Sequence, residues 1–321
     1  MPGIDFNSAL LAADHIKELA HSLGASVVGI VPSGPVKREN EFIEWLNRGY
    51  AADMDYLKRY QNQRFDPEKL LPGAKAIIVI GVNYFNPDEP DSAKNPYKVA
   101  RFAWGEDYHR ILRKMLKRIR NRLAENVAGL KGRICVDTAP FMDKYWAEQA
   151  GIGWQGKHTN LISRKFGNWL SLGSLIINAK VDEYDNPHKD YCGTCTRCLE
   201  ACPTGALVEP YVLDANLCIS YWTVESKDEK IPDNIADKLN NYVFGCDICL
   251  AVCPYNRGQR PTNSPELKRS ADVDRIESGE AAEYSEEEFR RKYSRSMLNR
   301  RGVFGIKRNL KASQKNGRPL K

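Results

Sequence analysis

Long apolar runs are missing from this sequence of 321 residues. No segment approaches the roughly 18 uninterrupted apolar residues of a membrane-spanning helix, which excludes a helical membrane protein. The first 20 residues also lack the apolar central region of a secretory signal, which argues against export. The sequence therefore predicts a cytoplasmic protein, whose nine cysteines stay free of disulfides in that reducing compartment. Internal repeats and low-complexity segments are missing too.

Acidic residues are absent from the end of the chain. From Arg290 to Lys321 the sequence holds twelve Lys and Arg residues and no Asp or Glu. Because this segment carries +12 and the whole chain only +7, the residues before it carry −5. Such asymmetry predicts a polyanionic partner. A nucleic acid is favoured over a membrane, because the segment lacks a large apolar face.

Helix and strand patterns alternate over the first 180 or so residues. In chain order, the pattern predicts helix 9–23, strand 26–31, helix 39–48, strand 76–85, helix 108–130, strand 133–136, helix 145–150 and strands 161–163 and 169–177. The alternation predicts an α/β or α+β domain. After residue 181 the cysteines become closely spaced. We therefore expect three parts, comprising residues 1–181, 182–260 and 261–321.

Eight of the nine cysteines lie in or between two closely spaced runs. The first run, residues 192–203, has the C-x2-C-x2-C-x3-C-P spacing of bacterial ferredoxins. The second, residues 246–254, lacks one early cysteine, and Cys218 is the nearby thiol that can supply it. In such runs the fourth cysteine binds the other cluster. This rule assigns Cys192, Cys195, Cys198 and Cys253 to one [4Fe-4S] cluster, and Cys202, Cys218, Cys246 and Cys249 to the second.

Two structural zinc sites are the alternative interpretation of these cysteines, since C-x2-C pairs also bind zinc. Zinc sites do not need a three-residue gap followed by Cys-Pro in both runs, so we favour a ferredoxin-like domain with two [4Fe-4S] clusters. Cys135 is left over, and we expect it to be a small buried hydrophobe at the end of a strand. Two such clusters transfer electrons but select no substrate, so the N-terminal domain must do so.

Four stretches together resemble the epoxyqueuosine reductase family. They are MDYLKRY followed by RFDPEKLLPGAKAIIVIGVNY, then ARFAWGEDYHRIL, CVDTAPFMDKYWAEQAGIGWQGKHTNLI, and CPTGALVEPYVLDANLCISYWT with FGCDICLAVCPYN. The resemblance covers about residues 10–308. It implies a cobalamin-binding N-terminal domain and reduction of epoxyqueuosine to queuosine at the wobble position of tRNA, the last step of queuosine biosynthesis. We expect a monomer that receives electrons from an external flavodoxin or ferredoxin.

The resemblance also implies roles for single residues. Asp137 matches the family's proton donor, which would need a raised pKa; capping of the following helix is the alternative role. Residues 153–161 match a segment that lines the cofactor, which the family binds base-off. His158 is therefore expected to contact cobalamin without ligating cobalt. The implied cobalamin contacts are Arg64, Ala100, Arg101, Asp137, Lys157, His158, Asn160 and Leu161.

The basic C-terminal segment interleaves aromatic and cationic residues, as surfaces that bind exposed RNA bases do. The candidate RNA contacts are Trp222, Arg290, Arg291, Lys292, Arg300, Arg301, Lys307 and Arg308. The basic face of the predicted helix 108–130 is a further candidate. Many family members continue into a helical-repeat domain, whereas this chain stops at Lys321. We therefore expect the core and the basic segment to hold the anticodon arm, and truncation near Phe289 to weaken RNA binding.

Two other functions fit parts of the sequence. A corrinoid reductive dehalogenase would share the cofactors, but the missing export signal and the basic segment argue against it. A ferredoxin-like electron carrier without enzymatic activity would share the cysteine runs, but it would not need some 180 residues before them.

Overall fold

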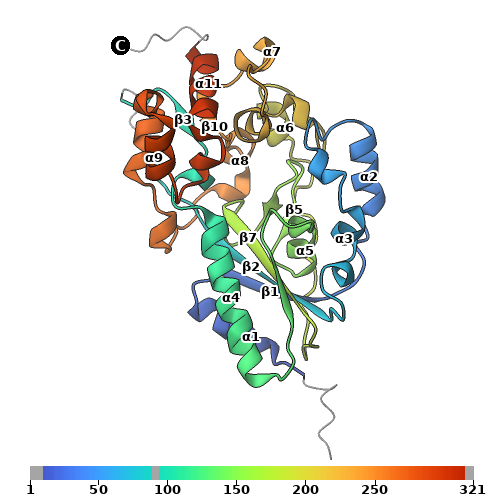
Figure 1. Ribbon diagram of the computed structural model, residues 1–321. Coiled ribbons are helices and arrows are strands. Elements are labelled where there is room, and N and C mark those ends of the chain that lie inside the picture. Colours follow the sequence, from blue (N-terminus) through green and yellow to red (C-terminus); the bar gives the residue numbers. More distant parts are fainter. Residues whose placement is uncertain (1–9, 89–93, 315–321) are drawn as a thin grey trace, which may run out of the picture.

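A four-stranded antiparallel sheet forms the centre of the computed structural model, which describes residues 10–88 and 94–314 (Figure 1). Its strand order is β1-β2-β7-β4. The strands are β1 (Val27–Pro32), β2 (Ala76–Asn83), β7 (Leu170–Ile177) and β4 (Gly132–Cys135). All three pairings are antiparallel, with β2 fully buried between β1 and β7.

Helices cover both faces of this sheet. Ile78 and Ile80 of β2 pack against α1 (Ala13–Ser22) and α4 (Tyr108–Asn126). The alternate residues of β2 pack against α5 (Asp143–Gln149) and residues of α2 (Glu39–Asn47) on the other face. Figure 1 shows α1 and α4 on one face and α5 on the opposite one. Burying each isoleucine stabilises the fold by about 1.5–3 kcal/mol, so the double-sided core accounts for the uninterrupted apolar run of β2.

The sequence predicted these helices and strands correctly, and most of their ends lie within a few residues of the predicted ones. Helix α4 ends at Asn126 rather than near residue 130, because Gly129 has a φ of 74° and turns the chain into β4. Its apolar stripe is buried and its basic face is exposed, as expected. Cys135 is completely buried at the end of β4, which confirms its predicted role as a small hydrophobe.

Short elements connect the sheet to the cysteine region. They are η2 (Asp55–Leu57), α3 (Gln61–Phe65), η3 (Pro67–Lys69), β3 (Lys98–Val99), η4 (Arg101–Ala103), β5 (Trp154–Gln155) and β6 (Leu161–Ile162). The cysteine region itself contains α6 (Arg197–Ala201), β8 (Leu207–Glu209), β9 (Val212–Leu213), η5 (Ala215–Leu217), the π-helical turn η6 (Tyr221–Glu225), α7 (Asp233–Ala236), β10 (Tyr242–Phe244), α8 (Ile248–Ala251) and η7 (Pro254–Asn256). Strand β10 pairs in parallel with β3, which joins this region to the N-terminal part.

The C-terminal residues form a folded helical layer. Its elements are η8 (Pro265–Leu267), α9 (Ala271–Glu277), η9 (Glu280–Glu283), α10 (Glu286–Lys292), η10 (Met297–Arg300) and α11 (Gly302–Gln314). The rings of Phe289 and Tyr293 stack with their centroids 4.3 Å apart, and both are buried with Phe244 of β10. The expectation that these two aromatic residues are exposed for RNA is therefore wrong, because they complete a hydrophobic core. The last seven residues of the predicted basic segment lie outside the described residues.

None of the helices in the described ranges is long and apolar enough to cross a membrane.

Candidate active site

His109 lies between two carboxylates at the start of α4. Asp107 caps this helix, because its Oδ1 accepts the His109 backbone N–H at 2.9 Å. The same oxygen lies 2.7 Å from His109 Nδ1, while Asp137 Oδ2 lies 3.1 Å from His109 Nε2. The Tyr108 ring stacks on the imidazole with centroids 4.2 Å apart. The helix cap therefore fixes the imidazole in contact with Asp137, the predicted proton donor.

Asp137 occupies a strained position just after β4. Its φ is 53°, in the left-handed region that few non-glycine residues adopt, and its side chain is 54% exposed. The residue does not cap α5: Met142 precedes that helix, and no side chain caps it. Arg113 helps to hold the loop, because its guanidinium donates to Thr138 Oγ1 at 2.6 Å. The geometry thus favours a functional role for Asp137 over helix capping.

The pKa of Asp137 differs from the expectation for a lone general acid. Burial on its packed side raises the pKa, but the hydrogen bond from His109 and the positive charge of that imidazole lower it. The net direction is down in the protein without its cofactor, and the rise expected from burial against the corrin stays a prediction for the cofactor-bound protein. Conversely, the two carboxylates raise the pKa of His109 to about 9, although burial lowers it. Asp137 is a carboxylate and His109 an imidazolium at neutral pH.

Further ionisable side chains surround Asp137. Asp143, at the start of α5, has its pKa raised to about 7 by burial and by the charge of Asp137. Lys144 also acts on Asp137, and its ammonium donates to Asn160 Oδ1 at 3.0 Å. Arg64 of α3 is 8% exposed. Within the described residues, its Nε and the Oδ1 of Asp143 are buried without hydrogen-bond partners. Two polar atoms at this site can therefore still bind a ligand.

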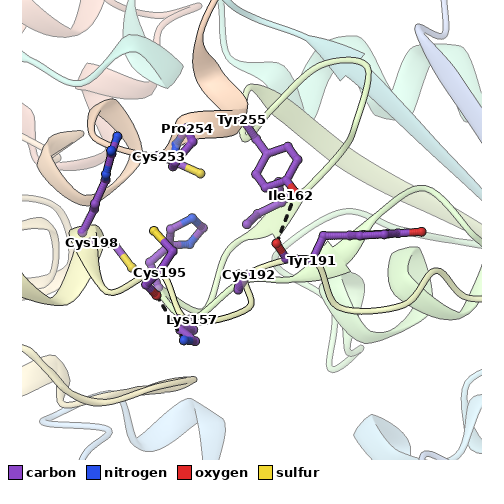
Figure 2. A pocket seen from close by; sticks show the side chains of 11 residues that line it. Lys157, Ile162, Tyr191, Cys192, Cys195, Cys198, Cys253, Pro254 and Tyr255 are labelled. Atoms are coloured by element: carbon purple, nitrogen blue, oxygen red, sulfur yellow. Dashed lines mark hydrogen bonds between the residues drawn. The ribbon is translucent and has the colours of Figure 1, made fainter.

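Four cysteines from both runs surround one cavity of about 230 Å³ (Figure 2). This first cysteine group consists of Cys192, Cys195, Cys198 and Cys253. Lys157 holds the cysteine loop, since its ammonium donates to the carbonyls of Gly193 and Cys195 at 2.6 and 3.1 Å. Cys253 faces this cavity although it ends the second run, as the ligand-exchange rule predicts.

The other four cysteines form a second group, which consists of Cys202, Cys218, Cys246 and Cys249. Burial raises the pKa of Cys246 to about 12, and the charges of Cys218 and Cys202 add to this rise. Helices α6 and α8, one from each run, pack together. Lys144 lies within electrostatic range of Cys218 and Cys249 as well as of Asp137. The second group is therefore next to the candidate active site.

The spacing of these thiols fits clusters better than single ions. Across residues 10–88 and 94–314, no three His, Cys, Asp or Glu side chains converge closely enough for one metal ion. Four thiols instead enclose the cavity of Figure 2, which is much larger than a zinc ion. Burial and, to a smaller extent, the charges of neighbouring thiols raise the pKa of Cys246 and Cys253, and coordination of iron would stabilise their thiolates.

Comparison with known proteins now identifies the family. A family model described as "Epoxyqueuosine reductase QueG, DUF1730" matches residues 64–138, and one described as "4Fe-4S double cluster binding domain" matches residues 191–256. The epoxyqueuosine reductase of Leadbetterella byssophila is 40% identical over 296 residues, which cover 92% of this chain and 96% of the relative. The chain belongs to the epoxyqueuosine reductase family. It is thus an oxidoreductase, and the second match assigns iron–sulfur binding to the cysteine region.

Solved epoxyqueuosine reductases have the same fold. One in complex with an epoxyqueuosine-modified tRNA-Tyr stem loop has a TM-score of 0.87 at 30% identity, covering 94% of this chain and 80% of that one. The enzyme from Bacillus subtilis, solved with a catalytic aspartate loop swung out of the active site, has a TM-score of 0.86 at 30% identity, covering 94% and 81%. These matches favour the reductase over the dehalogenase and the electron carrier.

The glycine-rich segment expected to line the cofactor of an epoxyqueuosine reductase packs mainly within the protein. A Cβ on Gly153 would lie 2.1 Å from the Ile162 carbonyl oxygen, so the close approach is to the β5–β6 hairpin. His158 is 2% exposed and contacts Asn168, and burial lowers its pKa to about 4. His158 and Lys157 face the first cysteine cavity. The sequence did not predict that these two residues face the cavity, because their position depends on contacts with the distant cysteine loop.

The remaining predicted cofactor contacts lie in different surroundings. Arg64 lies near Asp143, whose pKa Asp137 also affects. Asn160 accepts a hydrogen bond from Lys144, which in turn acts on Asp137. Arg101 lies between Trp104 and Trp169, and its backbone N–H donates to Asp247 at 2.8 Å. Ala100 and Leu161 are buried. The structure therefore brings only Arg64 and Asn160 of this set to Asp137.

The predicted RNA contacts separate into exposed and structural residues. Arg290, Arg300 and Arg301 line one cavity of about 290 Å³ with Glu286. Arg308, by contrast, donates to the carbonyls of Ser226, Asp228 and Trp222 and serves the fold. The indole of Trp222 donates to the Asn216 carbonyl at 2.6 Å. Arg291 is exposed, Lys292 pairs with Asp272, and Lys307 donates to the Tyr284 carbonyl.

Sequence reasoning assigned no role to several residues of the site. His109 was part of the quoted ARFAWGEDYHRIL stretch, but only its contact with Asp137 reveals a function. Asp143 and Lys144 were part of the quoted stretch that contains Asp137, but no role was predicted for them. Phe304 is 73% exposed on α11, the most exposed large hydrophobic residue among those described. No spacing in the sequence distinguishes it from its buried neighbours.

Proposed function

We propose that this protein removes the epoxide oxygen of epoxyqueuosine at the wobble position of tRNA and so forms queuosine. One observation carries the proposal: in a chain of this family, the open carboxyl group of Asp137 lies next to the second cysteine group, with Lys144 between them. Converting an epoxide to an alkene takes two electrons and two protons and releases one water molecule. A cluster in the second cysteine group would lie beside the pair of Asp137 and His109, so electrons and a proton would be available at one place, as this reaction needs.

Each cysteine group holds one [4Fe-4S] cluster in this proposal. The first group lies at a cavity lined by the exposed Tyr191, whereas Cys218 and Cys249 of the second group lie near Lys144, which also acts on Asp137. Electrons from an external flavodoxin or ferredoxin would thus enter at the first group and leave from the second toward Asp137. Either donor type would suit one-electron clusters, and the protein would act as a cytoplasmic monomer.

Cobalamin fits the surroundings of Asp137. Corrin rings carry amide side chains, which can donate to the free Asp143 Oδ1 and accept from the free Arg64 Nε. We therefore propose that Arg64, Asp143 and Asn160 hold the cofactor, bound base-off, with Asp137 facing it. Reduced cobalamin would supply the electrons for deoxygenation. The residues of this chain would orient the substrate and protonate the departing oxygen.

The tRNA would lie across the C-terminal helices. Arg300 is close enough to Asp137 for its charge to lower the pKa of that carboxyl, and it lines the arginine cavity with Arg290 and Arg301. A backbone phosphate bound in this cavity would therefore lie near the reacting nucleoside. Exposed Phe304 offers a surface for base stacking. Residues 1–181, 182–260 and 261–321 would then serve for cofactor binding, electron transfer and RNA contact.

The test is a reconstitution. Clusters are rebuilt without oxygen, cobalamin is added, and epoxyqueuosine-containing tRNA is incubated with a chemical reductant. Mass spectrometry of the nucleosides should show a loss of one oxygen atom, and omission of cobalamin should abolish it. Protein that has both clusters and bound corrin but leaves the nucleoside unchanged would overturn the proposed function.

A further inference from the structure

Both ring nitrogens of His109 lie within hydrogen-bond distance of a carboxyl group. Asp107 Oδ1 lies 2.7 Å from one ring nitrogen and Asp137 Oδ2 lies 3.1 Å from the other. Carboxylates only accept hydrogen bonds, and a neutral imidazole can donate from only one nitrogen. With both carboxyl groups ionised, both contacts are hydrogen bonds only if both ring nitrogens carry hydrogen. Either as an imidazolium beside a carboxylate or as a neutral imidazole beside a carboxylic acid, His109 and Asp137 share one transferable proton at this contact, and the lowered pKa of Asp137 favours the imidazolium.

We propose that His109 is the proton reservoir of the reaction, and that it supplies through Asp137 the proton taken by the departing oxygen. The inference rests on the proposed function and deepens it. His109 does not touch the substrate in this view, so it is a positioning and proton-supplying residue, whereas Asp137 is the catalytic one. Asp107 in turn fixes the imidazole through the cap of α4.

The reaction consumes two protons along with its two electrons. As the electrons enter the epoxide and a carbon–oxygen bond breaks, the departing oxygen gains negative charge. Asp137 delivers a proton to this oxygen, and the Nε2–H of His109 passes to the Asp137 carboxylate, which leaves a neutral imidazole hydrogen-bonded to Asp107. The second proton, which completes the water molecule, comes from solvent through the exposed Asp137 side chain. Solvent then reprotonates His109.

Asp143 is the competing proton source, because it is the other acid close to Asp137. His109 is favoured by contact: its Nε2 lies 3.1 Å from the Asp137 carboxylate, whereas Asp143 Oδ1 has no partner among the described residues. Other charges also act on this pair and would affect its pH dependence. They are Arg113 at the start of α4, Arg300 of η10, Lys144 of α5, Arg64 of α3 and the phenols of Tyr56 and Tyr108.

The first test is a pH–rate profile of single turnovers with His109→Gln. Glutamine can still donate to Asp137 but carries no exchangeable positive charge. In the wild type the pair keeps its proton until the pH rises through the pKa of His109, so the rate should fall only near pH 9. In the variant only the carboxyl holds the proton, so the rate should already fall below pH 7. At pH 8 we expect a loss of about 100-fold, and a smaller loss at pH 6.

Asp107→Asn is the matched control for position. Asparagine still caps helices well, so α4 should keep its start, but the charge that holds the imidazolium is lost. The high-pH fall of the rate should therefore move to lower pH without a large loss at pH 6. An unchanged profile in both variants would overturn the proposal. So would a profile that Asp143→Asn shifts and His109→Gln does not.

The second readout does not depend on catalysis. The chain has five histidines, so protein with isotope-labelled histidine gives few ring signals, and the one lost in His109→Gln identifies His109. We expect it to titrate near pH 9 in the cluster-loaded protein and lower in Asp137→Asn. Titration at the ordinary value of about 6.5 would refute the inference. If the wild-type protein does not reduce the nucleoside, the proposed function fails. The titration still shows whether His109 is protonated at neutral pH.

Discussion

At the scale of single residues, Asp137 combines a strained backbone with an open side chain. A φ of 53° costs a non-glycine residue on the order of 1 kcal/mol, although Asp and Asn tolerate the left-handed region better than others. The conformation turns the chain sharply after β4 and brings the carboxylate to His109. The stacking of Tyr108 and the hydrogen bond from Arg113 to Thr138 hold the two partners in place.

Asp137→Asn should separate proton delivery from cofactor binding. Asparagine is nearly the same shape, tolerates the same φ, and can accept the His109 Nε2–H, but it cannot pass on a proton. We expect single-turnover reduction to fall by about 100- to 1,000-fold. Binding of cobalamin, followed by its visible absorption after gel filtration, should stay unchanged. A variant with more than a tenth of the wild-type rate would exclude Asp137 as the proton donor.

The exchange of ligands between the two cysteine runs makes a prediction about pairs of substitutions. Cys253→Ser and Cys192→Ser each remove a ligand of the first group, so each should lose about half of the eight irons, and the double variant should lose no more. Cys253→Ser combined with Cys246→Ser should lose nearly all iron, because these cysteines belong to different groups. The opposite pattern, with Cys253 and Cys246 sharing one cluster, would refute the ligand assignment. Iron and sulfide analysis of the single and double variants measures how many clusters each retains.

At the scale of elements, apolar periodicity predicted the central sheet and its helices because each apolar residue there packs locally on one face. The same information was misleading at the C-terminus. Phe289 and Tyr293 lie among cations, which suggests a wet RNA-binding surface, yet long-range packing against Phe244 buries them. Which aromatic side chain of a basic helix faces outward depends on a partner strand more than 40 residues earlier in the chain. The exposure of Phe304 could therefore not be predicted.

The same packing changes the meaning of a truncation near Phe289. Such a cut would remove α11, whose Ile306 and Leu310 are buried with Phe244. The loss of this core would unfold part of the molecule, so weaker RNA binding after truncation would not identify an RNA contact. Point substitutions on the exposed side of the helices are needed instead.

Arg308→Ala tests the structural role of one predicted RNA contact. The guanidinium of Arg308 donates to the carbonyls of Ser226 and Asp228 at 3.0 and 2.7 Å, and to Trp222 in η6. Removing these bonds should lower the free energy of unfolding by about 2–3 kcal/mol, since hydrogen bonds to charged groups are strong and the freed carbonyls stay partly buried. Lys307→Ala, one residue away and exposed, should change it by less than about 0.5 kcal/mol. Thermal unfolding of both variants decides the matter. Equal stability of the two variants would contradict the structural role of Arg308.

At the scale of the whole molecule, charge and chemistry meet at one place. Nine of the twelve cations after Phe289 lie in the described residues, and these nine do not form a detached tail, because α11 packs on β10 and η6 of the cysteine region and on α10 (Figure 1). Arg300 connects this layer to the active site through its effect on Asp137. The asymmetry of charge was visible in the sequence, but its position relative to Asp137 depends on the pairing of β3 with β10.

The arginine cavity should therefore determine how salt affects RNA binding. Arg290 and Arg301 line this cavity. The Nε of Arg301 has no hydrogen-bond partner among the residues that the structure describes, so it could donate to a bound phosphate. Glu286 pairs with Arg290 at 2.6 Å and would have to share that cation. For a stem loop bound through both arginines, log affinity falls with log salt. Each phosphate that a substitution leaves without its arginine should make this slope less steep by about 0.7.

Arg290→Gln and Arg301→Gln, singly and together, test this arrangement by fluorescence anisotropy with an anticodon stem loop at several salt concentrations. Both arginines should contribute, so the double variant should lose more affinity at low salt than either single variant. Lys131→Gln is the control, because this exposed lysine precedes β4, does not line the arginine cavity and carries the same charge. Arg118→Gln examines the basic face of α4 in the same way. If the control changes the slope as much as the cavity variants do, the attraction comes from the overall charge of the protein and the cavity is not a phosphate site.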